Sequence, residues 1–82
     1  MDRVIKIGKT YRHFKGNMYR VLDIVYDSEE SNDNKYKKVV IYQALYGDRL
    51  KWARPYEMFN SEVDHKKYPD VKQKYRFEEV DE

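Results

Sequence analysis

The sequence contains no cysteine, no long apolar run and no large excess of either charge. Without cysteine the chain has no disulfide, no thiolate nucleophile and no cysteine-ligated zinc. No apolar stretch approaches the roughly 20 residues of a membrane-spanning helix, and residues 1–9 lack the apolar core of a signal peptide. Seventeen Lys and Arg oppose fifteen Asp and Glu, so the net charge of +2 gives no strong field toward polyanions. We therefore expect a cytoplasmic domain that does not bind a membrane.

Aromatic residues compensate for the modest apolar content. Nine Tyr, three Phe and one Trp make up 16% of the 82 residues, whereas charged residues make up 39%. A ring buries a large area per side chain, so a chain long enough for one small domain can still build a core. The number of rings exceeds what such a core can hide, which predicts a group of exposed rings.

The apolar pattern in the first half of the chain repeats every two residues, which predicts strands. Residues 10–14 and 18–26 form a predicted hairpin across a turn at Gly16, where positive φ costs little. Residues 27–38 are almost entirely polar, and we interpret them as a mobile surface loop.

The second half begins with the most apolar segment of the chain, residues 38–45. Both of its faces are apolar, which is typical of a strand in the middle of a sheet. Residues 50–54 return as a strand that stops at Pro55, which has no N–H to donate. Residues 56–59 have room for a single helical turn, and residues 61–64 for one last short strand.

The C-terminal segment, residues 65–82, is charged throughout. Tyr75 and Phe77 alternate with charges, which favours a terminal strand that docks two rings, whereas Val71 and Tyr75 at i, i+4 allow a helix. These elements predict an all-β fold, a small, strongly bent, SH3-like β-barrel of about five strands with a single helical turn. We divide the chain into a lead-in (1–9), the barrel core (10–64) and the charged C-terminal segment (65–82).

Four motifs in residues 10–63 resemble those of the bacterial family DUF1653. They are YRHFKG at 11–16, YRVL at 19–22, VIYQALYGD at 40–48 and WARPYEMF at 52–59. The first, third and fourth resemble the family signatures YRHFKG, VVYxALYGD and WxRPxxMF, YRVL resembles the family's second strand, and RFE at 76–78 resembles the usual close. The resemblance implies a small β-barrel-like domain with no established reaction.

Trp52 and Arg54 carry the first functional hypothesis. They are two residues apart on a predicted strand and so point the same way. An Arg beside an indole can stack on it and present planar donors to a carboxylate or phosphate. The alternative is that Trp52 joins Met58 and Phe59 in the core while Arg54 pairs with Asp48 or Glu57. The predicted non-enzymatic interaction face, for a peptide or a small anionic ligand, comprises Tyr42, Tyr46, Trp52, Arg54 and Tyr56.

A second cluster, Tyr11, Arg12 and His13, lies in the first predicted strand. Alternation places Tyr11 and His13 on one face and Arg12 on the other. His13 could serve as an acid or base near neutral pH, with Asp23 across the hairpin as a partner. The favoured alternative is a histidine that bonds its neighbour and holds the turn.

The remaining charged residues bear on metal binding, nucleic-acid binding and self-association. The two histidines and scattered carboxylates match no metal-site spacing, so we expect no metal and no cofactor. Basic residues interleaved with Tyr36, Tyr68 and Tyr75 would suit single-stranded nucleic acid, but acidic residues share the same segments. We therefore rank nucleic-acid binding second, and the sequence leaves homo-oligomer formation open. The basic residues are Lys35, Lys37, Lys38, Lys66, Lys67, Lys72 and Lys74.

Overall fold

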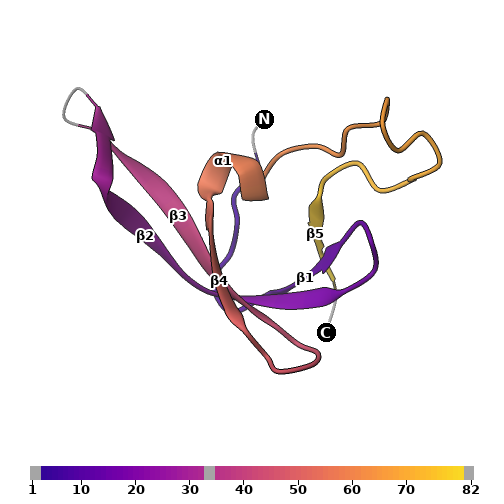
Figure 1. Ribbon diagram of the computed structural model, residues 1–82, viewed down its shortest axis with the longest axis horizontal. Coiled ribbons are helices and arrows are strands. Elements are labelled where there is room, and N and C mark those ends of the chain that lie inside the picture. The colour runs from indigo at the N-terminus through magenta and orange to yellow at the C-terminus, as the bar shows by residue number, and fades with distance from the viewer. Residues whose placement is uncertain (1–2, 33–34, 81–82) are drawn as a thin grey trace.

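The computed structural model describes residues 3–32 and 35–80 (Figure 1). Its elements are β1 (Thr10–His13), β2 (Met18–Asn32), β3 (Lys35–Ala44), β4 (Lys51–Pro55), α1 (Tyr56–Phe59) and β5 (Phe77–Glu79). The strands form one open antiparallel sheet in the order β4-β3-β2-β1-β5. The predicted all-β class, five strands and single helical turn are confirmed, while the likeness to an SH3 barrel stays a prediction. No helix in the described part of the chain is long and apolar enough to cross a membrane.

One face of the sheet, called the inner face here, carries the core. The register pairs Tyr11 with Tyr19 and Val21 with Tyr42, and paired residues of an antiparallel ladder share a face. Tyr11, Val21, Tyr42 and Val40 are all buried. On the outer face, the residues of β3 that alternate with them are half-buried. The apolar character of both faces of β3 therefore follows from its place between β2 and β4.

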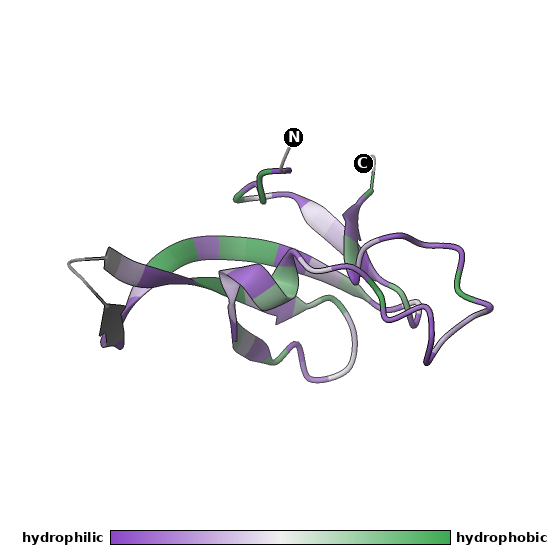
Figure 2. Cartoon of the chain, turned by 90° about the horizontal axis from the view of Figure 1, so that it is seen from above, coloured by the Kyte–Doolittle hydropathy of each residue, from purple (hydrophilic) through white to green (hydrophobic). Residues whose placement is uncertain are grey.

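Two phenylalanines connect the two edges of the open sheet. Phe59 belongs to α1, directly after the edge strand β4, and Phe77 begins β5 at the opposite edge. Their rings stack with centroids 4.1 Å apart and an interplanar angle of 7°. Tyr11 and Tyr42 meet the Phe59 ring edge-on, at 5.6 Å and 5.2 Å. The core is thus an aromatic cluster enclosed between the sheet and α1, and Figure 2 shows apolar residues concentrated along the middle of the sheet.

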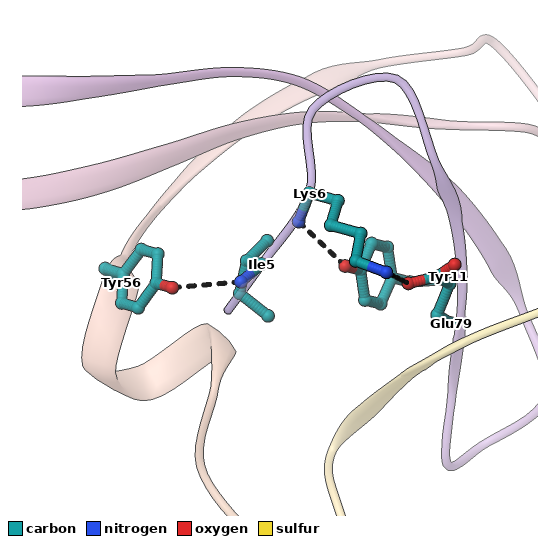
Figure 3. Close-up of polar contacts among 5 residues, drawn as sticks. All are labelled: Ile5, Lys6, Tyr11, Tyr56 and Glu79. Atoms are coloured by element: carbon teal, nitrogen blue, oxygen red, sulfur yellow. Dashed lines mark hydrogen bonds and ion pairs between the residues drawn. The ribbon is translucent and has the colours of Figure 1, made fainter. Parts of the chain in front are cut away.

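Two tyrosine hydroxyls hold the segment that precedes β1 (Figure 3). The N–H of Ile5 donates to the Tyr56 hydroxyl, and the N–H of Lys6 donates to the Tyr11 hydroxyl, each at 2.9 Å. The Lys6 ammonium also lies 3.5 Å from the carboxylate of Glu79 in β5. Ile5 is buried in the core as a result.

The predicted surface loop at residues 27–38 is wrong. β2 continues to Asn32 and β3 begins at Lys35, so most of this stretch forms a two-stranded ribbon that extends away from the core (Figure 1); residues 33 and 34 lie outside the described residues. The register shifts between Tyr26 and Ser31, where the Asp27 carboxylate accepts the N–H of Glu29. The described side chains at 28–29 and 36–38 are exposed, and the segment shows no apolar alternation, so the sequence lacks the usual strand signal.

The predicted strand at residues 61–64 is also wrong, because only an isolated bridge between Glu62 and Tyr75 forms there. The C-terminal segment takes the strand alternative rather than the helix. The Phe77 side chain is buried in β5. The guanidinium carbon of Arg3 lies over the half-buried Tyr75 ring, 3.9 Å from its centroid. Residues 61–76 therefore fold back and place β5 at the edge of the sheet, beside β1.

The Phe59–Phe77 stack gives a stability prediction. Phe59→Ala removes a fully buried ring with three aromatic contacts, and we expect it to lower the free energy of unfolding by about 3–5 kcal/mol. Urea unfolding followed by the fluorescence of the single Trp would measure the loss. Met58→Ala, one residue earlier and 49% exposed, is the control and should cost about 0.5 kcal/mol or less. Equal effects of the two variants would contradict this account of the core.

Candidate anion-binding pocket

Strand pairing brings the predicted pair Trp52 and Arg54 to the inner face. Trp52 pairs with Tyr42 and Arg54 pairs with Val40 across the β3–β4 ladder. Tyr42 and Val40 both belong to the core. Paired residues share a face, so the Trp52 indole and the Arg54 guanidinium also lie on the inner face, next to the buried cluster.

A pocket of about 180 Å³ lies at this end of the inner face. Trp52 is 48% exposed and Tyr46 is 45% exposed, whereas Tyr42 is 4% exposed. Buried Tyr42 therefore lies deepest, and the two exposed rings stand beside it. The pocket is lined by Tyr19, Tyr42, Tyr46, Trp52 and Arg54.

Four of the five predicted site residues thus line one pocket, and the fifth, Tyr56, does not. Tyr56 packs against the core and gives its hydroxyl to the Ile5 N–H. Tyr19 was missing from the prediction. Tyr19 pairs with Ala44 and shares the inner face with Val21, which brings its ring to the pocket. The alternation of Tyr19 and Val21 along the predicted strand 18–26 was a signal that could have placed Tyr19 on this face. The alternative that Trp52 and Met58 belong to the core is wrong, because both are about half exposed.

The hydroxyls of Tyr19 and Tyr46 are hydrogen-bonded to each other at 2.8 Å. Burial and this hydrogen bond raise the pKa of Tyr19 to about 12, so its hydroxyl keeps its proton at physiological pH. Each hydroxyl carries one proton, and the bond between them uses only one. The second proton is not used in this bond, and the Tyr19 hydroxyl also has a side-chain hydrogen bond to Asn17.

Arg54 supplies the positive charge of the pocket. Its guanidinium carbon lies 5.4 Å from the centroid of the Phe77 ring, so the ring it contacts is Phe77 and not the predicted Trp52. The expected ion pair with Asp48 or Glu57 does not form. Between the described side chains, those of residues 3–29 and 36–80, the one salt bridge is Lys6–Glu79. Arg54 therefore lines the pocket without a carboxylate at ion-pair distance among these residues.

A family described as "Protein of unknown function (DUF1653)" matches residues 9–79. The chain belongs to this family. The matched region runs from β1 to β5 and includes every residue that lines the pocket. No curated protein and no solved structure matches the chain.

His13 lies beside the pocket, against the same phenylalanine that supports Arg54. Its ring centroid is 4.9 Å from that of Phe77 and 6.4 Å from that of Tyr19. Burial, followed by the charges of Arg54, Lys15 and Arg76, lowers the pKa of His13 to about 4. Burial and these three positive charges therefore keep the imidazole neutral at physiological pH.

His13 also organises the β1–β2 turn. Its Nδ1 accepts the N–H of Lys15 at 3.1 Å, which confirms the reading of a histidine that holds the turn. The proposed partner Asp23 is engaged elsewhere, because its carboxylate accepts the N–H of Ile24. Tyr11 is buried in the core and Arg12 is exposed on the outer face, so the second predicted cluster does not converge on one site.

The two basic runs of the sequence lie at opposite ends of the molecule. Residues 35–38 belong to the ribbon of β2 and β3, and residues 66–74 belong to the connection between α1 and β5 (Figures 1 and 2). They do not form one continuous surface. In the described part of the chain, no three His, Asp or Glu side chains gather as a possible metal site.

The low pKa of His13 predicts how stability depends on pH. The unfolded chain, with a His pKa near 6.5, binds more protons than the folded chain between pH 6.5 and about 4. The free energy of unfolding should therefore fall as pH decreases through this window, and His13→Gln should weaken that dependence. His65→Gln controls for the loss of an imidazole, and a His13 proton titration by NMR with a midpoint at 6 or above would contradict the prediction.

Proposed function

We propose that this domain is a non-enzymatic binding module whose pocket takes a peptide or small ligand carrying a negative group. One observation carries the proposal. Arg54 lines an open pocket walled by four aromatic rings, and no carboxylate among the described residues pairs with it. A guanidinium that the fold leaves without an anion can take one from a ligand.

The groups around Arg54 suit such a ligand. A guanidinium offers planar, paired donors that match a carboxylate or phosphate. Trp52 and Tyr46 present rigid apolar area at little entropic cost, and the bonded hydroxyls of Tyr19 and Tyr46 add polar atoms to the same pocket. The ligand that fits best therefore joins a negative group to an apolar or aromatic part.

The positive surroundings support an anion rather than a neutral ligand. The charges of Arg54, Lys15 and Arg76 all act on His13, and the buried Nε of Arg76 has no hydrogen-bond partner. The separation of the two basic runs favours a small anion or peptide over nucleic acid, which needs a longer charged track.

Phenyl phosphate and phenylacetate are suitable probes, with benzyl alcohol as the neutral counterpart. In ¹H–¹⁵N spectra, the two anions should shift the indole N–H of Trp52, and the alcohol should bind at least about ten-fold more weakly because it lacks the charge-assisted bond. Arg54→Gln should weaken anion binding about ten-fold for the same reason.

Lys37→Gln is the matched control, since it removes one positive charge from an exposed position on the ribbon, away from the pocket. It should leave the affinity for phenyl phosphate unchanged. Equal affinity of the alcohol and the anions, or full binding by Arg54→Gln, would overturn the proposed function. Tight, salt-sensitive binding of single-stranded DNA without binding of the small anions would favour the nucleic-acid alternative instead.

A further inference from the structure

β4 lies at an edge of the sheet, directly beside the pocket. It pairs with β3 on one side only. The N–H of Ala44 donates to the carbonyl of Leu50 at 2.9 Å, and hydrogen-bonded pairs alternate with non-bonded pairs along an antiparallel ladder. Counting from Leu50, the backbone groups of Trp52 and Arg54 face β3, and those of Lys51 and Ala53 face away from the sheet.

The outward-facing groups are open to a further strand. Lys51 and Ala53 are exposed, and no other part of the described chain forms a hydrogen bond with their backbone. The edge is short, because Pro55 has no N–H to offer and is followed at once by α1. It therefore suits a few residues of extended peptide rather than a long strand.

We propose that an extended, acidic peptide adds to the edge of β4 as a further antiparallel strand. The inference rests on the proposed function, because one of the peptide's acidic side chains is the negative group that Arg54 binds. Side chains of an added strand alternate between the two faces, and the residue directly opposite Arg54 would come within about 5 Å, Cβ to Cβ. Backbone bonding to β4 and anion binding in the pocket are then parts of one mode of recognition.

The register predicts which peptide fits. Arg54 and Trp52 lie on the inner face, while Lys51 and Ala53 lie on the outer face. An antiparallel peptide would place an acidic residue opposite Arg54, an apolar residue two positions later opposite Trp52, and a second acidic residue opposite Lys51. The pattern is acidic-x-apolar-acidic, and Ac-Thr-Asp-Thr-Val-Glu-Thr-NH2 is a probe that carries it.

Charge decides between a peptide and a second copy of this chain. β4 carries two cations, Lys51 and Arg54, and no acidic residue. Two copies paired edge to edge about Ala53 would bring two positively charged strands side by side, and such edge charges oppose self-pairing. The same charges attract an acidic strand.

Hydrogen exchange by NMR tests the backbone contact directly. Adding the probe peptide should slow exchange of the Lys51 and Ala53 amides, whereas the Trp52 and Arg54 amides, already bonded to β3, should change little. N-methylation of the Thr between Asp and Val removes an N–H that faces β4, and should weaken binding, measured by Trp52 fluorescence, about ten-fold or more. N-methylation of the Val, whose N–H faces solvent, is the control and should preserve binding.

The outcomes separate this inference from the proposed function. If phenyl phosphate binds through Arg54 but the peptide leaves both amides unprotected, or both methylated peptides bind alike, edge pairing is wrong and the anion pocket remains. If neither the peptide nor phenyl phosphate binds, the proposed function fails as well. Protection of Lys51 and Ala53 without peptide, growing with protein concentration together with a dimer in sedimentation, would show that a second copy occupies the edge and would overturn the peptide assignment.

Discussion

The stack between Phe59 and Phe77 is the interaction on which the rest of the structure depends. The backbone ladder leaves the sheet open between β4 and β5, so side chains must connect the two edges. Phe59 reaches from the end of β4 and Phe77 from β5, and their parallel contact encloses Tyr11 and Tyr42 between sheet and helix. Without it, the inner face of an 82-residue domain would have too little covered apolar area to offset its chain entropy.

The same ring couples the core to the pocket. Phe77 packs on Phe59, supports the guanidinium of Arg54 and meets the imidazole of His13 edge-on. An arginine beside a core normally needs an acidic partner, and here an aromatic ring lies under it instead. The ring lies against the guanidinium without neutralising its charge, and the proposed function depends on that charge.

Tyrosine makes this arrangement possible because its ring can be buried while its hydroxyl still finds a partner. Tyr11 and Tyr56 direct their hydroxyls to consecutive backbone amides of the N-terminal segment. Tyr19 and Tyr46 direct theirs to each other inside the pocket. These four tyrosines thus divide into a structural pair and a pair that lines the pocket, whereas the exposed Tyr26 and Tyr36 on the ribbon contact each other and belong to neither.

Much of the site follows from strand alternation alone. Trp52 and Arg54 are two residues apart on one strand and therefore share a face. Pairing β3 with β4 as a hairpin then places Tyr42 on the same face, opposite Trp52. Tyr56 could not be placed in this way, because its partner Ile5 is 51 residues distant in sequence. Alternation with Val21 places Tyr19 on the inner face, but its position opposite Ala44 depends on the β2–β3 register, which a bulge shifts between Val21 and Asp23. The ribbon at 27–38 was not predicted because apolar residues alternate with polar ones only where one face of a strand is buried. The ribbon sequence has no such alternation.

The electrostatics of the pocket carry the argument one step further. Burial first, and then the charges of Arg54, Lys15 and Arg76, disfavour a proton on His13, and no described carboxylate lies at ion-pair distance from these three cations. Three cations gathered around one neutral imidazole also repel one another, which is an unfavourable term in the free protein. An anion beside Arg54 removes part of it, because it attracts each of the three charges at once. A ligand that binds only the native state stabilises the fold, so under the proposed function the relief of this repulsion adds to the affinity for an anion.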